Sequence, residues 1–104
     1  MGITVLVDDE RNLIADVVYK SGSAAMDGYP SLSDVDLLKM DHDLGPGQDG
    51  YDVLKYILHS PLGRWPLPKA VHLVTSNPVG RMRMKGLLMD AGYVFDYATG
   101  TWIR

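Results

Sequence analysis

An apolar run at residues 35–40 ends abruptly in Asp-His-Asp at residues 41–43. A Gly-Pro-Gly turn at residues 45–47 follows, and a helical pattern opens at Asp49. A buried strand that delivers acids into a glycine-rich loop before a helix is typical of open α/β sheets, whose ligands bind beyond the carboxyl ends of the strands. This stretch therefore predicts an α/β fold with a functional site at the end of the run.

The other apolar runs extend this pattern along the chain. Strands are expected at residues 3–7, 15–20, 35–40, 70–74 and 93–97, and residues 101–104 can add a short antiparallel strand. Helices are expected from Ser23, Asp49 and Asn77. Alternating strands and helices imply a mainly parallel sheet with right-handed crossovers. Five strands in 104 residues predict a single domain, residues 1–104, with a three-layer flavodoxin-like fold and strand order 2-1-3-4-5.

Two of the expected helices have well-defined starts. Asp49 can act as an N-cap, with Asp52 three residues later in a capping-box position. Asn77 followed by Pro78 is a strong start for the last helix. The methionines of that helix are expected to fill the core; they are Met82, Met84 and Met89.

Composition and charge exclude several classes of protein. An apolar content of 46% and a net charge of −3 indicate a folded domain, neither a disordered chain nor a protein that binds DNA through bulk positive charge. The chain has no cysteine, which excludes thiolate metal sites. Its apolar runs are far shorter than a membrane span, and its N-terminus has no signal-peptide pattern. We therefore expect no membrane partner and a cytoplasmic location, the host cytoplasm if the protein is viral.

Acidic residues follow the first and third expected strands. In the predicted strand order the ends of the first, third and fourth strands are neighbours. Four carboxylates then converge: Asp8, Asp9, Asp41 and Asp43. Such carboxylates repel one another unless some are protonated or a cation neutralises them. With oxygen ligands only, the cation would be hard, and Mg²⁺ (or Mn²⁺) is the natural choice.

Groups suited to a phosphate are expected opposite these acids. They are Arg11, Thr75, Ser76, Asn77, Gly80 and Arg81. Arg81 can chelate phosphate oxygens, and the N–H groups of Val79 and Gly80 at the helix start are expected to be free for an anion. Asp41 and His42 are the candidate catalytic residues, with His42 as a general acid or base. Capping of the last helix explains the Asn-Pro pair equally well.

These residues together resemble the receiver domain of two-component response regulators over nearly the whole chain. By that resemblance Asp8 and Asp9 would hold Mg²⁺, Asp41 would accept a phosphoryl group and Thr75 would be the switch hydroxyl. Receivers carry a Lys after the fifth strand, whereas residues 95–97 of this chain read Phe-Asp-Tyr. This difference argues against a phosphoacceptor role.

A closer resemblance is to the cyclic-phosphate processing receiver domains, which are small, often free-standing receivers of bacteria and phages. Four motifs carry it: residues 7–11 (Val-Asp-Asp-Glu-Arg), 41–45 (Asp-His-Asp-Leu-Gly), 50–52 (Gly-Tyr-Asp) and 77–81 (Asn-Pro-Val-Gly-Arg) with Met84. The resemblance implies chemistry on a cyclic phosphate. Val74 stands where the family has a His, and Thr75 replaces the family's Ser.

Three functional hypotheses follow. The first is a divalent-cation-dependent domain that binds a phosphate-bearing small molecule or RNA end and, if it is an enzyme, acts as a phosphoesterase on a cyclic or terminal phosphate. The second is a phosphoacceptor receiver that relays a signal to another protein. The third is a non-enzymatic interaction module, for example a phage protein that binds a host protein; Val74 and the loop around Trp65 favour it.

Overall fold

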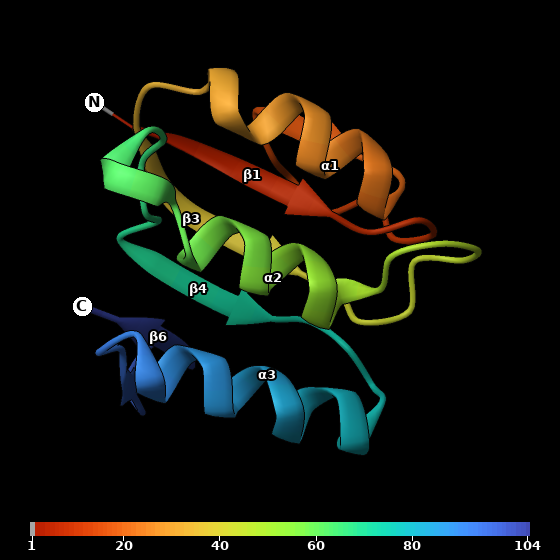
Figure 1. Cartoon of the computed structure of the whole chain (residues 1–104). Helices are drawn as coiled ribbons and strands as arrows, with labels where there is room; N and C mark the ends of the chain where they lie inside the picture. Colours follow the sequence, from red (N-terminus) through yellow and green to blue (C-terminus); the bar gives the residue numbers. More distant parts are fainter. Residues whose placement is uncertain (1) are drawn as a thin grey trace.

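The computed structural model describes residues 2–104 and shows an α/β domain built on one six-stranded sheet (Figure 1). The strands are β1 (Ile3–Val7), β2 (Val17–Tyr19), β3 (Val35–Met40), β4 (Ala70–Leu73), β5 (Val94–Asp96) and β6 (Thr101–Ile103). The helices are α1 (Gly22–Gly28), α2 (Gly50–Leu58) and α3 (Pro78–Asp90), with 3₁₀ turns η1 (Tyr29–Ser31) and η2 (Pro61–Gly63). The predicted α/β class, the mainly parallel sheet and the C-terminal antiparallel strand are confirmed.

The sheet order is β2-β1-β3-β4-β6-β5, which differs from the predicted order at one edge. Strands β2, β1, β3 and β4 are parallel neighbours, as expected. The position next to β4 belongs to β6, which runs antiparallel to both β4 and β5. The reason is the tight turn after β5, where Gly100 adopts a positive φ of 71° and returns the chain along the sheet. Trp102 of β6 is then buried against the core.

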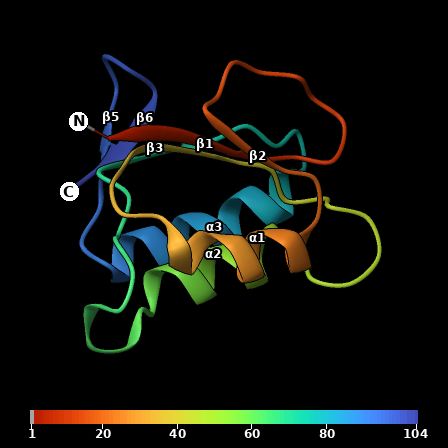
Figure 2. The ribbon, with the colours of Figure 1, turned by 90° about the horizontal axis from the view of Figure 1, so that it is seen from above.

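All three helices lie on the same face of the sheet, so the predicted three-layer arrangement is corrected to two layers (Figure 2). The cause is the connection from β1 to β2, which is a loop and not a helix. The helical crossovers from β2 to β3, from β3 to β4 and from β4 to β5 all step in the same direction across the sheet. Right-handed crossovers that step in one direction place their helices on one face. No helix among residues 2–104 has the length and apolar character needed to span a membrane.

The loop between β1 and β2 arches over the sheet face that carries no helix (Figure 2). Lys39 of β3 points to this face and donates a hydrogen bond from Nζ to the Ile14 carbonyl at 2.9 Å. Leu6 of β1, on the same face, is fully buried. The loop therefore covers part of the sheet where a helical layer was expected.

The core lies between the sheet and the helices and follows the alternation of the strands. Its buried side chains include Val5, Val7, Leu38, Met40, Val71 and Leu73 from the sheet, and Val53, Leu54, Ile57, Met84 and Leu88 from the helices. Tyr93 closes one end, where its hydroxyl donates to the Pro68 carbonyl at 2.5 Å and burial raises its pKa to about 12. Met84 is buried as expected, but Met82 and Met89 are 74% and 65% exposed, so their predicted core placement is wrong.

Two glycine contacts fix helices α2 and α3 against the end of β3. The N–H of Gly50, the first residue of α2, donates to the His42 carbonyl at 2.7 Å, and a Cβ at Gly50 would overlap the Asp41 carbonyl oxygen. A Cβ at Gly80 in α3 would overlap the imidazole of His42. The predicted caps are present: Asp49 and Asp52 form a capping box, and Asn77 Oδ1 accepts from the Gly80 N–H at 3.0 Å. The strand end and both helix starts are therefore in contact.

We predict that Gly50→Ala destabilises the domain although alanine is a better helix former than glycine. The added methyl group would displace the Asp41 backbone, and overpacking of this kind costs about 1–3 kcal/mol. Gly86→Ala, in α3, is the matched control because its Cβ would meet open space, and it should stabilise by about 0.5–1 kcal/mol. Urea unfolding of both variants measures the difference, and equal effects would contradict the close contact.

Candidate functional site

Three carboxylates meet at the carboxyl ends of β1 and β3. Asp8, Asp9 and Asp41 each offer one oxygen atom, and these atoms all lie within 4.8 Å of one another. Asp8 and Asp41 are buried, while Asp9 is not. Parallel pairing of Val7 with Met40 sets this convergence, because the residue after each strand then leaves the sheet at the same level. The sequence-predicted meeting of the two strand ends is therefore present.

Arg11 supplies the positive charge inside this cluster. Its Nη1 atom lies 3.2 Å from Asp8 Oδ2 and 3.4 Å from Asp41 Oδ2. The other Asp8 oxygen accepts the backbone N–H groups of Glu10 and Arg11, each at 2.9 Å. Burial raises the pKa of Asp8, but these backbone hydrogen bonds and the guanidinium outweigh it, so the pKa falls below its usual value of 3.8. Arg11, expected on a phosphate-binding wall, thus bridges two of the acids.

A polar pocket of about 270 Å³ opens beside the cluster. Its lining residues are Asp9, Glu10, Arg11, Asp41, Asp43, Gly45 and Ser76. Gly45 has a φ of 78°, a conformation that turns the loop after β3 around the pocket and favours glycine. Among the residues predicted for a phosphate, Arg11 and Ser76 therefore reach this pocket. Glu10 and Gly45 were not predicted as pocket residues. Both lie inside the acidic motifs at residues 7–11 and 41–45, so their positions could have identified them.

Asp43 lines the pocket but lies outside the group of three converging carboxylates. Its Oδ1 atom is 3.0 Å from His42 Nδ1 and 3.4 Å from Asn77 Nδ2. The hydrogen bond with His42, more than that with Asn77, lowers the pKa of the Asp43 carboxyl. Asp43 therefore lies at the edge of the pocket, between the end of β3 and the start of α3.

His42 does not line the pocket, because its ring packs against Gly80 of α3. Its Nδ1 atom contacts Asp43, and its buried Nε2 atom lies 3.5 Å from Asp49 Oδ2 without a hydrogen bond within the described chain. The arrangement suits a side chain that holds β3, α2 and α3 together. Asp49, predicted only as a helix cap, is thus also a neighbour of His42.

The start of α3 satisfies its own N–H groups in part. Asn77 Oδ1 accepts from the Gly80 N–H, so the expectation that this N–H is free for an anion is wrong. The buried hydroxyl of Thr75 accepts from the Asn77 N–H at 3.0 Å. Cap formation took precedence because an unpaired N–H at a partly buried helix start is costly.

Arg81 also turns to the backbone and not to the pocket. Its Nη2 atom donates to the Thr75 carbonyl, and the residue does not line the pocket. Its charge acts toward His72 of β4, where burial first, then Lys39 and Arg81, lower the pKa of the imidazole. The structure therefore brings Thr75, Asn77, Gly80 and Arg81 together as a supporting turn behind Ser76.

The site combines an acidic centre with a single guanidinium and an open polar pocket. Oxygen-only donor sets of this kind favour hard cations, and the lack of cysteine in the sequence removes the thiolate alternative. Two of the three carboxylates are buried and already share one positive charge from Arg11. The centre can accordingly accept a cation, and the pocket beside it can accept a ligand that carries charge.

The chain matches the model of a known protein family. No curated protein and no solved structure matches the chain. Residues 3–90, from the start of β1 to the end of α3, match the family model of the cyclic-phosphate processing Receiver domain. This segment contains every residue of the site described above and leaves the hairpin of β5 and β6 outside the match. The resemblance expected from the four sequence motifs is confirmed: the chain belongs to the cyclic-phosphate processing receiver domain family.

Proposed function

We propose that this domain binds Mg²⁺ or Mn²⁺ at Asp8, Asp9 and Asp41, and that the adjoining pocket takes a phosphate-bearing ligand, a nucleotide or RNA-end cyclic phosphate. The observation that carries this proposal is the convergence of three carboxylate oxygens within 4.8 Å at the edge of a polar pocket. The family's description as cyclic-phosphate processing supports the ligand class. A bound divalent cation would polarise a phosphoryl oxygen and lower the pKa of a bound water.

Arg11 has two roles in this proposal. Without another cation it balances the charge of Asp8 and Asp41, because it lies within 3.4 Å of both. When a bound cation balances the charge of these carboxylates instead, the Arg11 guanidinium is available for an anion in the pocket that it lines. Ser76 also lines the pocket and carries a hydroxyl that can donate to a phosphate. The phosphate contacts we propose are therefore those of Arg11 and Ser76, with Thr75, Asn77, Gly80 and Arg81 supporting the turn.

Proton transfer in this proposal uses Glu10 and not His42. Glu10 lines the pocket, whereas the His42 ring is held between Asp43, Asp49 and Gly80. A general base has to lie within hydrogen-bond reach of the proton it takes. We assign His42 a positioning role: it joins the end of β3 to the starts of α2 and α3.

The phosphoacceptor alternative receives less support from the structure. Asp41 is buried, and its Oδ1 atom already accepts the His42 N–H at 2.8 Å. The position beside β4 belongs to β6, which carries no Lys, and β5 lies one strand further away. A phosphoryl group on Asp41 would therefore lack the lysine partner that receivers place there.

The first test is the cation site itself. Isothermal titration calorimetry with Mg²⁺ and Mn²⁺ should show binding at millimolar concentration or tighter in the unmodified protein. Asp9→Asn and Asp41→Asn should abolish it, because each removes one of three converging carboxylates. Asp27→Asn, which changes an exposed acid on α1, is the control for overall charge and should bind as the parent does. Unchanged heats in both site variants would overturn the site.

The second test separates the two roles of Arg11. Arg11→Gln should tighten Mg²⁺ binding by roughly tenfold, since one positive charge near 3 Å from the carboxylates no longer competes. In the presence of Mg²⁺ the same variant should bind a nucleoside 2′,3′-cyclic phosphate roughly ten- to a hundredfold more weakly, because a charge-assisted contact is lost. Arg64→Gln, an exposed loop position, serves as the control. If Arg11→Gln leaves both affinities unchanged, the guanidinium has neither role.

The third test concerns the phosphoacceptor alternative. Incubation with Mg²⁺ and a small-molecule phosphodonor should give no long-lived aspartyl phosphate, because no lysine lies beside β4 on β6. Intact-protein mass spectrometry measures this directly. A stable mass increase of one phosphoryl group that disappears in Asp41→Asn would show that the domain is a phosphoacceptor after all.

A further inference from the structure

Helix α3 has a second apolar face that no other described part of the chain covers. Val79, Met82 and Met89 are 68%, 74% and 65% exposed, and Gly86, also exposed, lies between the two methionines. These four residues, the α3 stripe, follow one another at intervals of three, four and three, so they share one side of the helix. Met84 and Leu88 are buried on the opposite side. A surface helix needs only one apolar face to pack on its own core.

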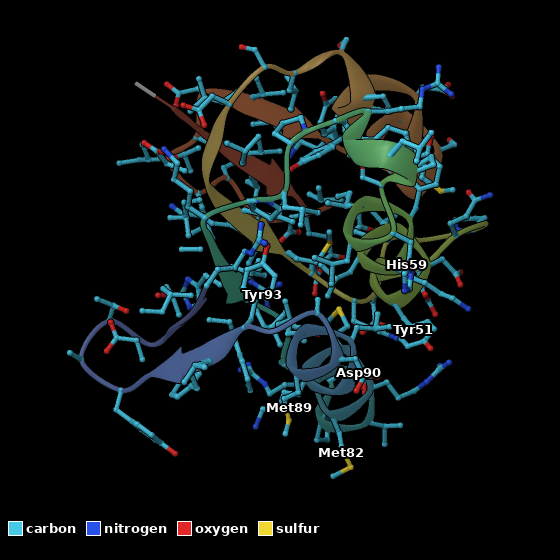
Figure 3. All side chains as sticks on the ribbon, turned by 60° about the vertical axis from the view of Figure 1, so that its left-hand side comes forward. Tyr51, His59, Met82, Met89, Asp90 and Tyr93 are labelled. Carbon is cyan, nitrogen blue, oxygen red and sulfur yellow. The ribbon has the colours of Figure 1, made fainter. Side chains whose placement is uncertain are left out.

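The α3 stripe continues onto the hairpin of β5 and β6. Met89 borders an apolar hollow of about 400 Å³ that is also lined by Tyr93, Val94, Phe95, Tyr97 and Trp102. Val94 and Tyr97 are 68% and 90% exposed. Figure 3 shows Met82 and Met89 extending from α3 away from the sheet, with Tyr93 on the sheet side. Contiguous exposed apolar surface of this kind marks an interaction site, and methionine is frequent in such surfaces.

We propose that the α3 stripe is a self-association surface, on which α3 of a second copy packs in antiparallel orientation across Gly86. Gly86 has open space around its Cβ position, so two helices can approach closely there. Met82 lies four residues before Gly86 and Met89 three residues after it. In an antiparallel pair centred on Gly86, Met82 of each copy therefore packs on Met89 of the other. Val79 of each copy then lies beyond the end of α3 of the other copy, level with the hairpin of that copy that carries Val94.

Charges along the stripe match the same arrangement. Arg83 and Asp90 lie on one flank of α3, where the Arg83 guanidinium stacks over Tyr51 of α2 at 4.1 Å. A two-fold axis at Gly86 places Asp90 of one copy level with Met82 of the other copy. Arg83 is the next residue along that helix, so it lies close to Asp90 of the first copy. Each interface would then contain two Arg83–Asp90 pairs, and the antiparallel helix dipoles would attract. These pairs are the kind of reciprocal contact that a two-fold dimer uses. Lys85, exposed on the other flank of the stripe, lies near the Lys85 of the second copy, and this repulsion weakens the association.

The size of the surface predicts a weak dimer. Helix α3 has 13 residues and is roughly 20 Å long. Stable interfaces remove about 1,200–2,000 Å² from solvent in total, which a helix pair of this length reaches only with the help of Val94 and Tyr97. We therefore expect association at micromolar and higher protein concentrations, separate from any cation or phosphate binding.

Sedimentation velocity of the full chain over a micromolar to millimolar concentration series tests the proposal. The unmodified protein should shift from monomer to dimer, and Met82→Glu with Met89→Glu should raise the dissociation constant at least about a hundredfold, because four unpaired charges would enter the interface. Ile14→Glu is the matched control, since Ile14 is 90% exposed and lies on the loop at the other face of the sheet. A chain that is monomeric throughout, or association that Ile14→Glu weakens equally, overturns the proposal.

A charge exchange tests the antiparallel register. Arg83→Asp and Asp90→Arg should each weaken association by about tenfold, and the double variant should return to within about threefold of the unmodified protein, because the pairs re-form with reversed sign. Thermal unfolding checks that every variant is folded. If loss of the Tyr51 contact destabilises Arg83→Asp, the Asp90→Arg variant provides the single-charge comparison. A double variant that stays as weak as the single ones overturns the antiparallel arrangement.

Discussion

The arrangement of the site depends on the balance of charge between two buried carboxylates and one guanidinium. Asp8 and Asp41 leave neighbouring strands at the same level, and Arg11 lies within 3.4 Å of both. Two buried carboxylates without a counter-charge would be costly, so the loop after β1 has to bring Arg11 back over the strand ends. The backbone N–H groups of Glu10 and Arg11, which donate to Asp8, hold that loop in place. The route of residues 8–16 across the open sheet face starts from this contact.

A second constraint is the close approach of two glycines to the end of β3. Gly50 and Gly80 have no side chain, so the starts of α2 and α3 reach the Asp41 carbonyl and the His42 ring. The pocket is lined by the loops after β1 and β3 and by Ser76 after β4, and the starts of α2 and α3 contact its β3 side. This explains why His42 is directed into the packing of the domain, and why the chemistry we propose relies on residues of the first acidic motif and on Ser76.

The one-sided placement of the helices has a consequence at the far edge of the molecule. All three helical crossovers step in the same direction, so α3 is the outermost helix and has α2 on one side only. Its outward face is free of other described elements, and there the sequence places Met82 and Met89 instead of charged residues. The cation site and the α3 stripe are thus separate features, one at the strand ends and one on the outer helix.

Local patterns along the chain were enough to predict most helices and strands and the acidic centre. Runs of β-branched residues, the Asp49 and Asn77 caps and the strand-end acids depend on local patterns, and the convergence of Asp8 with Asp41 depends only on parallel pairing of β1 with β3. The remaining features depend on contacts that form only in the folded domain. The directions of Arg11, His42 and Arg81 follow from competition between partners far apart in the chain, such as Asp41, Gly80 and the Thr75 carbonyl. The exposure of Met82 and the insertion of β6 beside β4 likewise depend on which surfaces remain uncovered after packing, and a local pattern contains no information about that.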